Sequence, residues 1–240
     1  MKENSSDNGY QPANTLPRFA VIVAGGSGTR MGGGLPKQFR KLCNRPVLWW
    51  SMKRFHEENR DTRIILVLPE EFITLWQDIF SALPKSEQFE HLIATGGSTR
   101  SESVKRGLSL IQEEDSLVAV HDGARPLIST EIISTGWEIA RRYEAAIPVV
   151  AVSDSLRKVS GSQNQTVDRN EFVAVQTPQV FKTLLLKEAY AKADNKIFTD
   201  DAAVVENAGH RVSLFDGSYN NIKITNPKDL EIAKVLMEDA

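Results

Sequence analysis

The feature that most constrains the fold of this chain is a regular alternation of short β-branched runs with longer amphipathic runs, which begins at Phe19. Short runs rich in valine and isoleucine are typical of buried strands, and the longer runs have the apolar spacing of helices. We predict strands at 19–23, 63–68, 91–95, 117–121, 145–152, 172–176, 211–215 and 222–225. Strands that alternate with helices imply an α/β fold with a mostly parallel sheet covered on both faces.

Start signals for five helices lie between these strands. Prolines and short polar residues favour the first positions of a helix, and the predicted starts lie at Pro46, Ser98, Thr130, Thr199 and Asn226. Ligands of parallel sheets bind beyond the carboxyl ends of the strands. We therefore expect the functional residues in the turns that follow strands.

The composition indicates one globular domain for a small ligand. The 240 residues contain 29 Lys and Arg against 31 Asp and Glu, without the basic excess of a nucleic-acid-binding protein. No stretch approaches the ~18 apolar residues of a membrane span, so we expect no membrane partner. The single Cys43 excludes a disulfide framework and suits a reducing compartment, which predicts a cytoplasmic location.

Two segments depart from the alternation. Residues 1–17 are polar and predict a disordered N-terminal tail, which leaves 18–240 as a single domain. Residues 153–170 are also polar, with a turn-like sequence at 161–164. They predict a two-stranded arm that projects from the domain and needs a partner surface to be stable. A plain surface loop is the alternative.

A glycine-rich turn, VAGGSGTRM, follows the first predicted strand at 23–31. Its glycines let backbone N–H groups approach a phosphate closely. The turn matches neither the dinucleotide-binding fingerprint nor the P-loop. Arg30 and Lys37 add two cations near the same strand end, which suits a polyphosphate. The alternative is that both side chains are simply solvated.

A carboxylate follows the strand at 117–121. In the sequence VHDGARP, Asp122 lies at the carboxyl edge of the predicted sheet, where it would suit a magnesium ion that also binds substrate phosphates. A turn-forming aspartate before glycine is the alternative. We predict that His121 is packed or hydrogen-bonded rather than catalytic.

Two further motifs are less specific. GGSTRSESV at 96–104 brings a glycine turn to a helix start, where free N–H groups favour anions or polar bases, but an ordinary capped helix explains it equally well. NIKIT at 221–225 alternates, so Lys223 points away from Ile222 and Ile224. Lys223 is then either a firmly held cation or a solvated lysine on an edge strand.

With these motifs in this order, the chain from Phe19 onward resembles the 2-C-methyl-D-erythritol 4-phosphate cytidylyltransferases of isoprenoid biosynthesis. The matching blocks are AGGSGTRM, LPKQF, GGSTRSESV, VHDGARP, TVDRN, QTPQVF, FTDDAAVVE and NNIKITNPKDL. The resemblance implies a Rossmann-like nucleotidyltransferase fold whose β-arm interlocks two subunits of a homodimer. It also implies CTP and 2-C-methyl-D-erythritol 4-phosphate as substrates, and Mg²⁺ as cofactor.

The resemblance implies a role for each matching residue. The nucleotide would be bound by Ala24, Gly25, Gly26, Gly97, Arg100, Ser103 and Gly123. The catalytic cations would be Arg30, Lys37 and Lys223, and magnesium would bind Asp122. The sugar phosphate would be held by Lys223, Thr199 and, from the arm of the partner subunit, Ser155 and Arg169. The family often has Asp at Ser98, Thr at Ser155 and Glu at Asp201.

The implied reaction is an attack of a phosphate monoester oxygen on the α-phosphorus of CTP. This nucleophile is already an anion at neutral pH, so catalysis should come from positioning and charge stabilisation rather than from a general base. The alternatives are a ribitol-5-phosphate cytidylyltransferase, a sugar-1-phosphate nucleotidyltransferase and a non-catalytic nucleotide-binding module. The TVDRN block at 166–170 favours methylerythritol phosphate as the acceptor, and the set of cations argues against a module that only binds.

Overall fold

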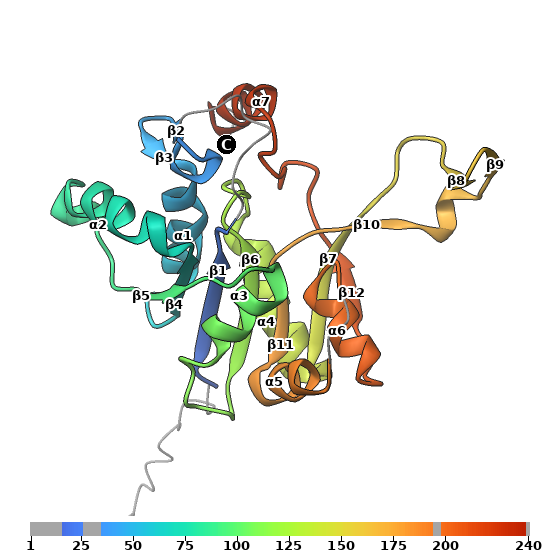
Figure 1. The fold of residues 1–240 in the computed structure, drawn as a ribbon, viewed down its shortest axis with the longest axis horizontal. Helices are drawn as coiled ribbons and strands as arrows, with labels where there is room; N and C mark the ends of the chain where they lie inside the picture. Colours follow the sequence, from blue (N-terminus) through green and yellow to red (C-terminus); the bar gives the residue numbers. More distant parts are fainter. Residues whose placement is uncertain (1–15, 26–34, 194–197, 239–240) are drawn as a thin grey trace, which may run out of the picture.

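The protein is an α/β sheet protein with an arm, as the computed structural model in Figure 1 shows; it describes residues 16–25, 35–193 and 198–238. Eight strands of these described ranges form the main sheet, in the order β10-β7-β11-β6-β1-β4-β5 with β12 also paired to β7. Their bounds are β1 Arg18–Val23, β4 Arg63–Leu68, β5 Leu92–Thr95, β6 Leu117–Asp122, β7 Ala145–Ala151, β10 Val173–Val175, β11 Gln179–Lys182 and β12 Ser213–Asp216.

The sheet is mostly parallel, as the sequence predicts. The pairs β1–β4, β1–β6, β4–β5 and β7–β12 are parallel, whereas β11 runs antiparallel to β6 and β7, and β10 runs antiparallel to β7. Val23, the last residue of β1, is in register with Asp122 at the end of β6 and with Val67 of β4. The loops after β1, β5 and β6 therefore leave the sheet at one edge.

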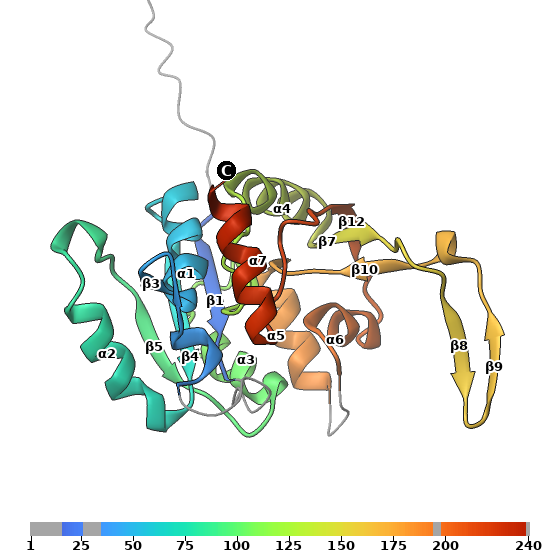
Figure 2. The ribbon, with the colours of Figure 1, turned by 90° about the horizontal axis from the view of Figure 1, so that it is seen from above.

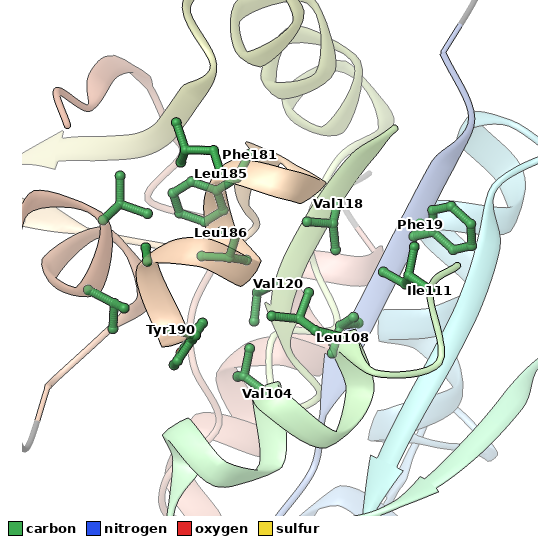
Figure 3. Close-up of a cluster of buried hydrophobic side chains, with 14 of the residues drawn as sticks. Phe19, Val104, Leu108, Ile111, Val118, Val120, Phe181, Leu185, Leu186 and Tyr190 are labelled. Atoms are coloured by element: carbon green, nitrogen blue, oxygen red, sulfur yellow. The ribbon is translucent and has the colours of Figure 1, made fainter. Parts of the chain in front are cut away.

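Helices cover both faces because alternate residues of each central strand point to opposite sides. One face carries α3 (Arg100–Leu108), α5 (Thr183–Lys192) and α6 (Asp201–Asn207), which bury a cluster that includes Phe19, Val118 and Val120 (Figure 3). The other face carries α1 (Val47–Glu58), α2 (Ile73–Ser81) and α4 (Thr130–Tyr143). The C-terminal helix α7 (Pro227–Glu238) contributes to a third, smaller cluster near the short strands β2 (Lys41–Leu42) and β3 (Arg45–Pro46).

The structure corrects several sequence predictions. The predicted strand at 222–225 is wrong, because this part of the described chain is irregular. Its backbone is anchored instead to the loop after β6, where the Ile224 N–H donates to the Ala124 carbonyl at 2.8 Å. Thr225 is engaged in the start of α7, since its N–H donates to Asp229 Oδ2 at 2.7 Å. The sequence pattern also did not predict β11, α2 and α5, and it placed the N-caps of α3, α4 and α6 one residue from the observed Thr99, Ser129 and Asp200.

The polar segment forms a two-stranded arm where the sequence predicts one. Strands β8 (Arg157–Ser160) and β9 (Gln163–Thr166) pair antiparallel, and every residue in both is exposed. Gly161 in the connecting turn has φ +57°, a conformation that glycine adopts without a steric penalty. Figures 1 and 2 show that the arm extends well beyond the body of the molecule.

Residues 1–15 of the predicted disordered tail lie outside the described residues. Within the described part of the chain, no helix combines the length and the apolar content needed to cross a membrane.

Candidate active site

A cavity of about 300 Å³ lies at the carboxyl edge of the parallel strands. We call it the strand-end cavity. It is lined by Val23, Ala24, Gly25, Lys37, Gln38, Gly97, Ser98, Thr99, Arg100, Ser103, Asp122, Ala124 and Lys223. Most of the sequence-predicted site residues are in this lining, although they come from separate stretches of the chain. They are Ala24 and Gly25 after β1, Lys37, the group Gly97, Arg100 and Ser103 at the start of α3, Asp122 at the end of β6, and Lys223 before α7.

The loop after β1 forms one wall of the cavity. The Ala24 N–H donates to the Val67 carbonyl at 3.0 Å, and the Ala24 carbonyl accepts from Gln38 Nε2 at 2.9 Å. Gln38 is buried and lies next to Lys37 in a short 3-10 helix, so it fixes Lys37 relative to the loop. The sequence motif contains Gln38 but did not indicate this role. Gly26 and Arg30 lie outside the described residues.

Asp122 forms the electrostatic centre of the cavity. Lys223 Nζ lies 2.7 Å from Asp122 Oδ2, Arg125 Nε lies 3.7 Å from the same oxygen, and Arg100 Nε lies 3.8 Å from Oδ1. Burial by itself would raise the pKa of this carboxyl, but Lys223 and the two arginines outweigh burial and lower the pKa to about 2. Asp122 is therefore an anion at any physiological pH.

Arg100 is held from the opposite side by α6. Its Nη2 donates to Asp201 Oδ2 at 2.6 Å, and the Tyr190 hydroxyl donates to Asp201 Oδ1 at the same distance. Burial alone would lower the pKa of Arg100, but the carboxylate of Asp201 raises it. Asp201 is fully buried, and its N–H donates to Gln179 Oε1 at 3.0 Å. The guanidinium is thereby fixed between α3 and α6.

Lys223 reaches the cavity from the irregular segment before α7. Ile224 is fully buried and Ile222 partly buried in the cluster under α7, whereas the Lys223 side chain is 42% exposed and points to Asp122. The predicted orientation of Lys223 therefore holds even though the predicted strand is wrong. Arg125, to which the sequence pattern assigned no role, donates from Nη1 to the Asn221 carbonyl at 2.7 Å.

His121 is a buried structural histidine, as predicted. Its Nδ1 lies 3.1 Å from Thr177 Oγ1 and its Nε2 lies 3.1 Å from the Arg125 carbonyl. Burial lowers its pKa to about 4, so the ring is neutral at pH 7. The Asp122 N–H donates to the same Thr177 hydroxyl at 3.1 Å, which connects the histidine to the carboxylate loop.

The start of α3 is capped by its own side chains. Thr99 Oγ1 accepts from the Glu102 N–H at 3.1 Å, and the Ser103 hydroxyl accepts from the Gly97 N–H at 3.0 Å. A Cβ atom at Gly97 would lie 2.3 Å from Glu102, so this position has no room for another side chain. The interpretation as a capped helix is thus correct, and the same residues also line the cavity.

Four predicted site residues lie elsewhere. Gly123 lies between the lining residues Asp122 and Ala124 without being part of the lining, and a Cβ there would lie 2.9 Å from Leu48 Cδ1. Ser155 and Arg169 are exposed in the arm segment, and Arg169 bonds the carbonyl of Ser153. Thr199 precedes α6 and is exposed. None of the four belongs to the described lining of the strand-end cavity.

The fold and the cavity define a class of protein: an α/β protein with a cationic site, at the carboxyl ends of parallel strands, suited to a phosphate-rich ligand. Among the described residues, no group of three His, Cys, Asp or Glu side chains could hold a metal ion by itself. The family model for 2-C-methyl-D-erythritol 4-phosphate cytidylyltransferase matches residues 19–239. The chain belongs to this family of nucleotidyltransferases.

Individual relatives agree over nearly the whole chain. The 2-C-methyl-D-erythritol 4-phosphate cytidylyltransferase of Bacteroides thetaiotaomicron is 47% identical over 224 residues, which cover 92% of this chain and 100% of that protein. The crystal structure of the enzyme of that name from Thermus thermophilus has a TM-score of 0.74 at 33% identity, covering 93% and 100% of the two chains. The 4-diphosphocytidyl-2C-methyl-D-erythritolsynthase from Anaerococcus prevotii has a TM-score of 0.79 at 27% identity, covering 93% and 96%.

Proposed function

We propose that this protein transfers the cytidylyl group of CTP to 2-C-methyl-D-erythritol 4-phosphate and releases pyrophosphate. The observation that carries the proposal is the convergence of Lys37, Arg100 and Lys223 on one cavity in a chain that belongs to the cytidylyltransferase family. The described lining has three cations and one carboxylate, Asp122. Asp201 compensates Arg100 from outside the lining, and the two lysines suit a triphosphate that a second anionic phosphate must approach.

The residues divide the chemistry as follows. The phosphate monoester oxygen attacks the α-phosphorus, a new P–O bond forms, and the bond to the β-phosphate oxygen breaks. Lys37 offsets the charge that develops on the phosphates, and Lys223, 2.7 Å from Asp122, orients the attacking phosphate. Arg30 has the same assigned role as Lys37. Arg100 and the capped start of α3 bind the nucleoside side of CTP.

We propose Asp122 as the residue that would hold a magnesium ion. The donor set fits, because the carboxyl is ionised at neutral pH, with a pKa of about 2, and magnesium requires only one or two carboxylates when substrate phosphates complete its shell. The ion would neutralise phosphate charge on the bound nucleotide. Lys223 Nζ contacts Oδ2 of Asp122, and Arg100 Nε lies 3.8 Å from Oδ1.

We further propose a homodimer in which the arm completes the site of the partner. Both arm strands are fully exposed, and Ser155 and Arg169 lie outside the cavity of their own chain. The CTP requirement and the exposed single Cys43 support a cytoplasmic location. Mixing an Arg169→Ala variant with a Lys37→Ala variant tests the exchange of arms. Recovery of activity in the mixture supports it, and a mixture that stays as inactive as its components contradicts it.

The activity itself is tested by pyrophosphate release from CTP with three acceptors: methylerythritol 4-phosphate, ribitol 5-phosphate and none. The proposal expects turnover with the first and a kcat/KM at least roughly tenfold lower with the second. Preference for ribitol 5-phosphate would identify the other cytidylyltransferase. Binding of CTP without release of pyrophosphate in the presence of either acceptor would identify a binding module.

A further inference from the structure

The segment that carries Lys223 has no regular backbone pairing. Residues 217–225 connect β12 to α7 and form neither strand nor helix. Its Lys223 nevertheless lies 2.7 Å from Asp122. Backbone bonds anchor both ends of the segment, since the Gly217 N–H donates to the Val149 carbonyl and the Ile224 N–H donates to the Ala124 carbonyl, each at 2.8 Å. The residues between these two bonds lack the hydrogen-bond ladder of a sheet, so side chains contribute to holding them in place.

Two buried amide side chains supply that support. Gln176, which follows β10 directly, donates from Nε2 to the Ser218 carbonyl at 2.8 Å and accepts at Oε1 from the Ser218 N–H at 3.3 Å. Asn221 donates from Nδ2 to Gln176 Oε1 at 3.2 Å and to the Thr177 carbonyl at 2.9 Å. Asn221 is fully inaccessible and Gln176 is 7% exposed, so these bonds are shielded from water.

The backbone is shaped around this pair. A Cβ at Gly217 would lie 2.6 Å from Gln176 Oε1, so the glycine permits the amide to approach the loop. On the other side, the Asn221 carbonyl accepts from Arg125 Nη1 at 2.7 Å. Backbone bonds also hold the residues on both sides of Lys223, since the Ile222 N–H donates to the Asn220 carbonyl and the Ile224 N–H donates to the Ala124 carbonyl, each at 2.8 Å.

We propose that Gln176 and Asn221 form an amide clamp that positions Lys223 against Asp122 for the reaction. Neither side chain lines the strand-end cavity, so both are positioning residues that act through Lys223. This inference rests on the proposed function. Since a displacement of about 1 Å in a reacting group can cost ~10²-fold in rate, loss of the clamp should be visible in turnover even when the fold survives.

The experiment is a double-mutant cycle on the full-length protein with CTP and methylerythritol 4-phosphate. Asn221→Ala removes both donated bonds, and Gln176→Met removes the polar contacts while it preserves most of the side-chain volume. We expect each to lower kcat/KM by roughly 10- to 100-fold. In a Lys223→Gln background, the same substitutions should lower kcat/KM by less than about twofold, because the group they position is already gone.

A matched control lies in the same loop. Tyr219 is 64% exposed and donates its hydroxyl to the Ala151 carbonyl at 2.9 Å, outside the clamp. Tyr219→Phe should leave kcat/KM within about twofold of wild type. Thermal melts by circular dichroism identify any variant that fails to fold. If Asn221→Ala does not fold, the cycle with Gln176→Met and Lys223→Gln tests the proposal.

Three results bear on the proposal. If the fold-losses in kcat/KM of the single variants multiply in the double variants, the proposal is overturned, because the amides then act independently of Lys223. Wild-type rates in both clamp variants would also overturn it. Absence of pyrophosphate release by the wild-type protein would instead reject the proposed function, so failures of the two proposals are distinguishable.

Discussion

Asp201 offers the most direct test of what holds Arg100 in position at the strand-end cavity. It is fully buried, and its two carboxylate oxygens accept from Arg100 and Tyr190, each at 2.6 Å. The Asp201→Asn substitution keeps the shape of the side chain but removes the charge that compensates Arg100. Both partners would then face an amide in which one of the two oxygens is replaced by an N–H donor.

The expected magnitude follows from burial. Removing one partner of a buried ion pair costs about 3–5 kcal/mol, and we place this pair near the lower end because the Arg100 side chain is 27% exposed. A loss of about 3 kcal/mol corresponds to a fall of roughly 6–12 °C in Tm for a chain of this size. Since Arg100 lines the strand-end cavity, the KM for CTP should rise as well.

The assay is urea unfolding at pH 7 together with steady-state kinetics at varied CTP. Glu206→Gln, on the exposed side of the same helix, is the matched control and should change the stability by less than about 0.5 kcal/mol. A loss below about 1 kcal/mol for Asp201→Asn, with the KM for CTP unchanged, would refute the reasoning that this carboxylate holds Arg100 in a charged, buried pair.

Three further predictions concern other parts of the molecule. Lys37→Ala should lower kcat by ~10²–10³, which is the scale of losing one charge-stabilising donor. Lys41→Ala, at the exposed position of β2, is the control and should keep a kcat near that of the wild type. Equal kcat values for the two variants would remove Lys37 from the mechanism. Arg169→Lys should raise the KM for the sugar phosphate more than that for CTP, because a guanidinium grips phosphate through two parallel bonds; equal shifts would contradict this. His91 Nε2 accepts from Trp76 Nε1 at 2.9 Å and burial lowers the pKa of His91, so the folded state resists its protonation and stability should fall as pH drops below about 6.5. His91→Gln should make that decline less steep in urea unfolding between about pH 7 and pH 5; the part that remains includes His121, whose pKa burial lowers to about 4. An unchanged slope would argue that His91 does not contribute.

The sheet and the edge where the cavity lies could be predicted from the sequence because those features are local. The continuous apolar runs of β1 and β6 specify strands that are buried on both faces, and a parallel arrangement then brings Ala24 and Asp122 to the same edge. The arm at 153–170 was predictable for the opposite reason, since its residues have too little apolar surface to join the core.

The errors arose where long-range contacts override local pattern. The alternating segment 222–225 has a strand-like sequence, yet the Ala124 carbonyl, Arg125 and the cap of α7 leave it without a strand partner in the described sheet. The short antiparallel β11 was missed because its length gives little periodicity, and only its place between β6 and β7 makes it a strand. Gly123 has two explanations. The resemblance places it beside the nucleotide, but its close packing against Leu48 by itself also requires a residue without a side chain.

The α/β class, the family resemblance and most of the predicted residues of the strand-end cavity can be read from the sequence, because motifs lie in neighbouring positions. The contacts that hold those residues in place are visible only in the folded protein. Arg100 meets Asp201 across 101 positions and Arg125 meets Asn221 across 96. Such pairs leave no local pattern, since their energy comes from burial and charge compensation that exist only once the chain has folded.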